Sequence, residues 1–367
     1  MKMIDCHYHN RQWLEGEEDF IEVEKRYRRE CGIGAVNALS LTRYGGQGKT
    51  AVWQNIMAAI LKLEDKAVYA QGALFYPEPS DDQGAPEYDL KEQVREMMAL
   101  GLDGVKMLES KPNIYKRLTP RIDSTYYEEY FDYLEKEQIP LLWHVADPKE
   151  FWDEEKVSEN AKVHGWFYGD GTFPSLEQIY GEVYTVLEKH PGLVVIFAHC
   201  FFKSHVPEQI IQLFETYEKV YIDLTPGPEM YRDFTEKREL WKEIFQKYPD
   251  RILFGTDVDN MLDLKTQKRL VEDIVRFLTT EDTFTGIEYY GEEYAYHLYG
   301  LGLEPEILDR VFGQNFTGVL GKKPREINRQ ALKDYIARYH RHIPEGKTRE
   351  MILEYYRTRL GGENCEG

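Results

Sequence analysis

The sequence predicts an α/β fold, a (β/α)8 barrel of the TIM type with a helical extension at its C-terminal end. Short apolar runs recur eight times, and each is followed by an amphipathic stretch with apolar residues at three- and four-residue steps. Apolar strands that alternate with helices are typical of a parallel sheet covered by helices. The alternation spans about 280 residues, near the roughly 250 of such a barrel. A doubly wound sheet would alternate in the same way, so the choice depends on the chemistry of the strand ends.

The predicted strands lie at residues 2–7, 35–41, 67–75, 103–109, 139–146, 193–199, 220–225 and 251–257. The predicted helices lie at residues 17–31, 51–64, 88–100, 124–137, 175–189, 207–217, 235–248 and 266–279. An aromatic segment follows at 284–303, then a helix near 304–312 and a charged helical tail at 324–360. Within the aromatic segment, residues 288–300 are expected to form an amphipathic helix that packs on the protein or contacts another subunit. We expect one barrel domain over residues 1–321, with residues 322–367 as a helical extension packed on it.

The charge of the chain excludes several classes of partner. It carries 46 Lys and Arg against 65 Asp and Glu, a net charge of −19, without a basic block, so nucleic acid and anionic membranes are unlikely partners. The first residues lack the apolar core of a signal peptide, and no apolar run approaches the ~18 residues of a spanning helix. Four scattered cysteines suit a reducing compartment. We expect a cytoplasmic protein that binds a small molecule, with self-association left open.

Polar residues end four of the predicted strands. His7 and His9 are two residues apart at the end of the first, so their side chains share one side of an extended chain. His144, His199 and Asp257 end the fifth, sixth and eighth strands. A single histidine at a strand end is more often a hydrogen-bonded core residue, but four histidines and an aspartate on one barrel face favour a site. Imidazole and carboxylate are ligands of Zn²⁺ and related ions such as Mn²⁺, and an incomplete ligand set leaves room for an activated water. The pattern therefore indicates a hydrolytic metal site and favours the barrel.

These stretches resemble the amidohydrolase superfamily of metal-dependent hydrolases. The resemblance is to its amidohydrolase-2 branch of single-domain barrels, which includes aminocarboxymuconate-semialdehyde decarboxylase-like and lactonase-like enzymes. The matching stretches are DCHYH (5–9), LLWHVAD (141–147), IFAHC (196–200) and LFGTD (253–257). In addition, VFGQNFTGVLG (311–321) resembles the Asn-containing helix that often closes such chains. The resemblance covers about residues 1–321.

The resemblance implies His7, His9, His144 and Asp257 as metal ligands. His199 would be either a further ligand or an acid/base and electrophile. Asp257 would also take a proton from water whose pKa the ion lowers toward ~7.

Lys106, near the end of the fourth predicted strand, decides between one ion and two. In binuclear members of the superfamily, a carboxylated lysine on that strand bridges two ions, and His144 and His199 would then bind the second. The alternative is a lysine that pairs with a carboxylate or with substrate. Because this branch is usually mononuclear, we expect one ion.

Two further residues are candidates for substrate binding. The stretch YGGQGKT (44–50) does not fit a phosphate-binding P-loop, because Arg43 stands where the motif needs glycine. Arg43 is instead expected to bind a substrate carboxylate, with a structural ion pair as the alternative. The connection at residues 147–174 is long enough for a lid, and its Trp166 could line a pocket or pack the loop on its own barrel.

Together these observations predict a metal-dependent enzyme that hydrolyses an ester, lactone or amide bond of a small polar substrate, with His199 stabilising the developing charge. The same kind of site supports non-oxidative decarboxylation. A third alternative is a barrel that binds a metal or ligand without catalysis.

Overall fold

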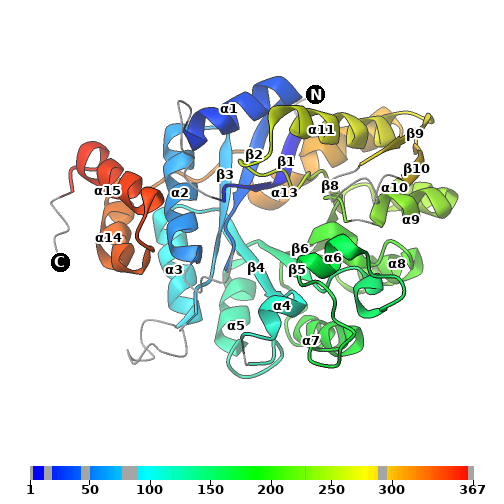
Figure 1. Cartoon of the computed structure of the whole chain (residues 1–367), viewed down its shortest axis with the longest axis horizontal. Helices are drawn as coiled ribbons and strands as arrows, with labels where there is room; N and C mark the ends of the chain where they lie inside the picture. The colour runs from blue at the N-terminus through cyan, green and yellow to red at the C-terminus, as the bar shows by residue number, and fades with distance from the viewer. Residues whose placement is uncertain are drawn as a thin grey trace.

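The computed structural model describes residues 3–11, 19–42, 50–76, 89–118, 120–227, 229–287 and 296–362. Eight parallel strands form one sheet in the order of the chain, and helices surround it (Figure 1). The strands are β1 (Met3–His9), β2 (Ile33–Leu39), β3 (Val68–Ala73), β4 (Gly104–Ser110), β5 (Leu141–Val145), β6 (Val195–Phe197), β7 (Val220–Asp223) and β8 (Ile252–Leu253). Each overlaps the strand predicted at its place in the sequence, so the prediction of a (β/α)8 barrel is confirmed.

Backbone hydrogen bonds join the last strand to the first. The amide of Cys6 donates to the carbonyl oxygen of Phe254 at 3.0 Å, just beyond β8. Further along, the amide of Asp257 donates to His7 O at 2.9 Å, and the amide of His9 donates to Val258 O at 2.8 Å. These bonds nearly close the sheet and set the segment that carries Asp257 beside β1.

A long helix follows each strand. These helices are α1 (Phe20–Cys31), α2 (Thr50–Glu64), α3 (Leu90–Leu100), α5 (Glu128–Glu137), α7 (Leu176–Lys189), α8 (Pro207–Thr216), α10 (Arg238–Lys247) and α11 (Leu264–Thr279). Shorter helices are α4 (Pro112–Tyr115), α6 (Glu159–Val163), α9 (Met230–Glu236), α12 (Pro305–Asp309) and α13 (Asn315–Leu320). Side-chain and backbone chemistry sets the ends of several helices. Asp19 caps the start of α1, because its side chain accepts hydrogen bonds from the amides of Ile21 and Glu22. Gly101 ends α3 with a φ of 96°, a conformation that favours glycine.

Apolar side chains pack on both sides of the strands. The larger core lies between the strands and the surrounding helices. A separate cluster fills the barrel and includes Ile4, Leu142 and Ile196. Phe316 and Leu320 of α13 complete this cluster at the amino ends of the strands. Asn315 anchors α13 there, because its Nδ2 donates to the carbonyl oxygens of Pro249 and Ile252 at 2.8 and 2.7 Å. The barrel is thus filled at one end and carries its polar residues at the other.

The segment after α11 differs from the prediction. Residues 296–299 form a strand, β10 (Tyr296–Tyr299), which pairs antiparallel with β9 (Thr283–Gly286). The helix predicted over 288–300 is therefore wrong for these residues, and residues 288–295 lie outside the described part of the chain. Leu298 is buried between exposed neighbours, a period of two that fits a strand and not a helix.

The C-terminal tail forms α14 (Arg329–Tyr339) and α15 (Lys347–Arg359), which lie beside α2 and α3 (Figure 1). Leu332 and Ile336 are buried in the larger core, and the amide of Asn328 donates to Leu100 O at 2.9 Å. In the described residues, each helix is too short or too polar to cross a bilayer. The division of the chain at residue 321 stays a prediction.

Candidate metal centre

An irregularity in β1 turns the side chains of Cys6 and His7, which are adjacent in sequence, toward the barrel axis. Cys6 belongs to the cluster inside the barrel, whereas Tyr8 packs outside it and stacks on Tyr27 of α1 with ring centroids 5.4 Å apart. The register of β1 against β2 shifts between Asp5 and Tyr8. This shift lets His7 face inward directly after Cys6, and His9 then follows on the same side, as the two-residue spacing predicts.

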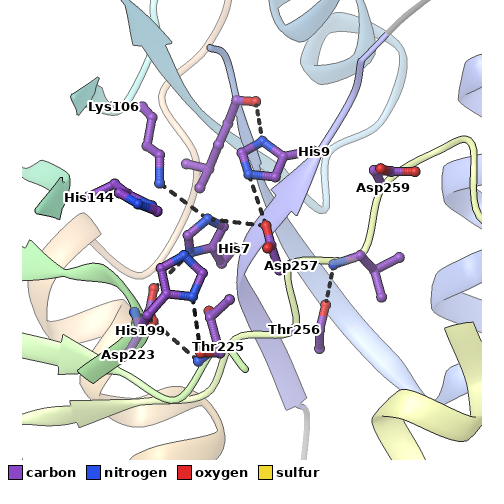
Figure 2. Close-up of polar contacts among 12 residues, drawn as sticks. His7, His9, Lys106, His144, His199, Asp223, Thr225, Thr256, Asp257 and Asp259 are labelled. Carbon is purple, nitrogen blue, oxygen red and sulfur yellow. Dashed lines mark hydrogen bonds and ion pairs between the residues drawn. The ribbon is translucent and has the colours of Figure 1, made fainter. Parts of the chain in front are cut away.

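His7, His9 and Asp257 bring three ligand atoms together at the carboxyl ends of the strands (Figure 2). His9 Nε2 lies 3.1 Å from Asp257 Oδ1, and His7 Nε2 lies 3.6 Å from the same oxygen. All three atoms lie within 4.8 Å of one another, and all three residues are buried. Two imidazoles and a carboxylate at this separation can share one divalent ion.

The Nδ1 atoms of three histidines each lie near an oxygen (Figure 2). His7 Nδ1 lies 2.8 Å from Asp223 Oδ2, His9 Nδ1 lies 3.1 Å from Leu39 O, and His199 Nδ1 lies 3.3 Å from Thr225 O. Since these oxygens accept hydrogen bonds, the proton of each neutral ring belongs on Nδ1. The lone pair of each Nε2 is then left for an ion, an arrangement found around metal-bound histidines.

Burial keeps the rings of His7 and His199 neutral. It lowers the pKa of His7 well below its usual value, and burial together with His144 lowers the pKa of His199 to about 4. Burial alone would raise the pKa of Asp257, but the hydrogen bond with His9 and the nearby His7 lower it well below its usual range. Neutral imidazoles beside an ionised carboxylate are the protonation states that metal binding requires.

His199 lies in a strained turn, η3 (Ala198–Phe202), directly after β6. Residues 199–202 have φ values of 54°, 52°, 59° and 48°, a left-handed conformation that side chains with a Cβ rarely adopt. The amide of His199 donates to Asp223 Oδ1 at 2.8 Å, which helps to hold the turn. Backbone strain of this kind is often found at functional sites. Here the turn places the ring centroid of His199 5.4 Å from that of His7.

His144, at the end of β5, joins the same group of rings. Its ring centroid lies 4.9 Å from that of His199. Its Nε2 lies 3.2 Å from Asp147 Oδ1, and the hydroxyl of Tyr168 donates to Asp147 Oδ2 at 2.7 Å. Burial, followed by the charge of Lys111, lowers the pKa of His144 to about 4. The structure thus brings His144 into the site but outside the three-atom group, so its role as a ligand stays a prediction.

Comparison with known proteins shows the family of the chain. A family model described as amidohydrolase matches residues 4–322, most of the chain. The chain belongs to the amidohydrolase family. This is a family of metal-dependent enzymes that act on small substrates. No curated protein matched the chain in a sequence search.

Solved structures of the same fold support the barrel. An uncharacterized TIM-barrel protein from Bordetella bronchiseptica matches at a TM-score of 0.55 and 16% identity, over 87% of this chain and 98% of that one. A putative amidohydrolase from Staphylococcus aureus matches at 0.53 and 15%, over 88% and 100%. A 2,6-dihydroxybenzoate decarboxylase from Rhizobium matches at 0.51 and 14%, over 87% and 98%. At these identities the likeness shows the fold of this amidohydrolase and not its reaction.

Lys106 lies inside the barrel on β4, with Nζ 3.1 Å from His7 Nε2 (Figure 2). Burial lowers its pKa to about 8, so the neutral amine is accessible near neutral pH. Lys106 therefore lies where it was predicted, beside the candidate metal ligands. Carboxylation of Lys106 and a second ion stay predictions.

Asp223 is a functional residue that the sequence reasoning missed. One carboxylate oxygen faces His7 Nδ1 and the other accepts from the amide of His199, so a single side chain orients two site residues. The signal was present, because Asp223 lies near the end of the seventh predicted strand, VYIDLT (220–225), and Asp257 ends the eighth. Burial raises the pKa of Asp223, which makes these hydrogen bonds necessary for its ionised form.

The two predicted substrate residues have different outcomes. Arg43 lies outside the described residues, so its role stays a prediction. Trp166 is half-buried within the long connection, where it stacks on Phe151 with ring centroids 5.9 Å apart and a 15° angle between the planes. Lys111 Nζ lies 5.5 Å from its ring and also forms an ion pair with Asp147. Trp166 is thus linked to the site through Lys111, and its contact with substrate stays a prediction.

Glu229, between β7 and α9, is another acidic residue close to the site that the sequence reasoning missed. It is buried, and none of the described residues donates to its Oε2. A Cβ added at Gly227 would lie 3.2 Å from Phe202 and 3.5 Å from the carboxyl oxygens of Glu229. Phe202 in turn stacks on His199, with ring centroids 4.9 Å apart. Burial, followed by two nearby carboxylates, raises the pKa of Glu229 to about 8, so its carboxyl group is protonated at neutral pH.

Proposed function

We propose that this amidohydrolase hydrolyses an ester, lactone or amide bond of a small polar substrate with the help of one bound divalent ion. The observation that carries the proposal is the convergence of His7 Nε2, His9 Nε2 and Asp257 Oδ1, with an oxygen near each imidazole Nδ1. Zn²⁺ accepts this mixture of nitrogen and oxygen ligands, and Mn²⁺ is an alternative. When bound, the ion would supply a Lewis acid that lowers the pKa of water toward about 7 and polarises a carbonyl group.

The residues of the chain supply the proton transfers. Asp257 is held ionised, so it can accept a proton from water without leaving its place beside His9. His199 is neutral, with Nδ1 near Thr225 O, which leaves Nε2 to take up the proton that Asp257 has received from water. Once protonated, His199 would stabilise negative charge on the substrate and then donate the proton to the leaving group.

The buried amine of Lys106 favours non-oxidative decarboxylation as a second candidate. A protonated Lys106 beside His7 would hold a substrate carboxylate at the centre of the site. One structural neighbour is a 2,6-dihydroxybenzoate decarboxylase, which makes aromatic carboxylic acids reasonable test compounds. Arg43 would provide a second carboxylate contact in either reaction.

A substrate panel tests the proposal. Purified protein is incubated with lactones, esters, amides and aromatic carboxylic acids, before and after treatment with a chelator and again after Zn²⁺ or Mn²⁺ is restored. Acid release that stops with the chelator and returns with the ion supports hydrolysis, whereas CO₂ release indicates the decarboxylase. No turnover on the whole panel by a protein that holds its ion tightly would favour a barrel that only binds a ligand.

A further inference from the structure

A groove opens at the end of the barrel opposite the candidate metal centre. It has a volume of about 760 Å³. Ile4, Ala35 and Tyr69, near the amino ends of β1, β2 and β3, form its floor. The walls are the end of α2 and the turn to β3, the stretch from α12 to α13, and residues 322–327 after α13. The volume lies in the range of about 300–1,000 Å³ that small-molecule sites occupy.

The groove is basic in an acidic protein. Its lining includes five basic and two acidic residues, Lys62, Lys66, Lys322, Lys323 and Arg325 against Asp309 and Glu326. The chain as a whole carries a net charge of −19. This excess of positive charge is therefore local to the groove and opposite in sign to the rest of the molecule.

Two further acidic residues beside the groove, Asp103 and Asp65, are already paired. Asp103 forms an ion pair with Lys62 and accepts from the backbone amide of Arg325 at 2.7 Å. Asp65, directly before Lys66, pairs with Arg28 instead. Among the described residues, no carboxylate lies within ion-pair distance of the three exposed lysines at the groove, Lys66, Lys322 and Lys323. Their charges remain available to a ligand.

Contacts with the barrel hold the wall of the groove in place. The guanidinium group of Arg325 donates to Met98 O at 2.9 Å, and the hydroxyl of Tyr69 donates to Gly321 O at 2.9 Å. Gly101 allows the wall to lie against the end of α3, because a Cβ at this position would stand 2.1 Å from Glu326 O. A fixed wall presents Lys322 and Lys323 without the full ordering cost of a flexible loop.

We propose that this groove binds a small molecule with two or more closely spaced phosphate groups. Several lysine ammonium groups around one cavity suit a compact ligand with several negative charges, and lysine is a common phosphate binder. The net negative charge of the protein disfavours a large polyanion, because most of its surface would repel one. The groove lies at the amino ends of the strands, so its ligand is distinct from the substrate of the metal centre.

Isothermal titration calorimetry of the full chain with inorganic tripolyphosphate tests this proposal, with citrate as a carboxylate probe of comparable charge. The groove variant is Lys66→Glu with Lys322→Glu and Lys323→Glu. The matched control is Lys136→Glu with Lys156→Glu and Lys265→Glu, three exposed lysines outside the groove, which changes the net charge equally. A milder variant, Lys322→Gln with Lys323→Gln, keeps the test valid if the charge reversals impair folding.

We expect the wild type and the control to bind tripolyphosphate with affinities within about threefold of each other, and the groove variant to bind at least about tenfold more weakly. The milder variant should weaken binding by a smaller factor. No binding to the wild type at millimolar tripolyphosphate would overturn the proposal, as would equal losses in groove variant and control. Citrate bound as tightly as tripolyphosphate would show that the site does not select phosphate.

Discussion

Ionisable groups are buried at one end of the barrel and exposed at the other. At the carboxyl ends of the strands, His7, His9 and Asp257 are buried, and each lies within hydrogen-bond distance of another polar group. At the amino ends, Lys322 and Lys323 are exposed beside an open groove. Buried ionisable groups interact strongly with one another, whereas exposed charges are weakened by water and salt.

This difference predicts which amino-acid substitutions the protein should tolerate. A buried group that loses its partner carries a desolvation penalty that nothing offsets, so substitutions near the metal centre should have large and specific effects. Substitutions in the groove should alter ligand binding and leave the barrel unchanged.

The largest effect is expected from Asp257→Asn. The amide cannot act as the ionised ligand and proton acceptor, so turnover of whichever substrate the panel identifies should fall on the order of 10³-fold. Asp282→Asn, an exposed aspartate, is the control and should leave kcat unchanged. Wild-type turnover in Asp257→Asn would remove Asp257 from the mechanism.

Asp223→Asn should have the next largest effect, on metal affinity. Loss of the charged acceptor at His7 Nδ1 should weaken the binding of Zn²⁺ by about 10- to 100-fold, the usual result when such a partner is removed. Competition with a chromophoric chelator measures this affinity. An unchanged affinity, in a variant whose circular dichroism matches the wild type, would contradict the role given to Asp223.

Glu229 should make stability depend on pH. Its pKa is raised from 4.5 to about 8 by folding, so between these values the folded chain holds a proton that the unfolded chain has lost. The free energy of unfolding should therefore fall as pH rises through this range, and Glu229→Gln, which cannot ionise, should remove that loss. At pH 7 the variant should be more stable by roughly 3 kcal/mol, with little difference at pH 4.

Urea denaturation of both proteins at the two pH values measures the effect of Glu229→Gln. Glu236→Gln is the control, since Glu236 is 66% exposed on the neighbouring helix α9. Equal stability of Glu229→Gln and wild type at pH 7 would show that the Glu229 carboxyl finds a partner in solution.

The smallest effect on the barrel is expected from Lys322→Gln with Lys323→Gln. Because both lysines are exposed and form no ion pair with a described residue, the free energy of unfolding should change by less than about 0.5 kcal/mol. Metal content and turnover should equal those of the wild type. A loss of bound metal in this variant would show that the two ends of the barrel are coupled.

Much of the architecture could be predicted from sequence, because near-continuous apolar strands recur at barrel spacing. The two-residue spacing of His7 and His9 and the strand-end position of Asp257 were enough to place them together. Asp223 was missed, since its role depends on contacts with His7 and His199 that are distant in sequence. The strand at 296–299 is predicted as a helix because the tyrosines of residues 288–300 recur at steps of two, three and four residues, which do not distinguish the two periods.

Other features of the site arise only from the folded backbone. The register shift in β1 lets Cys6 and His7 both face inward, and no local sequence pattern predicts this shift. The left-handed turn at residues 199–202 contains no glycine, the residue that would signal it in sequence. The closeness of Lys106 to His7 depends on how β4 faces β1 across the barrel.

The metal content of the purified chain tests the central claim most directly. Inductively coupled plasma mass spectrometry of the wild type should find about one divalent ion per chain, and His7→Ala should lose it. Two ions per chain would assign Lys106 a bridging role. A metal-free wild type that gains no activity with Zn²⁺ or Mn²⁺ would contradict the account.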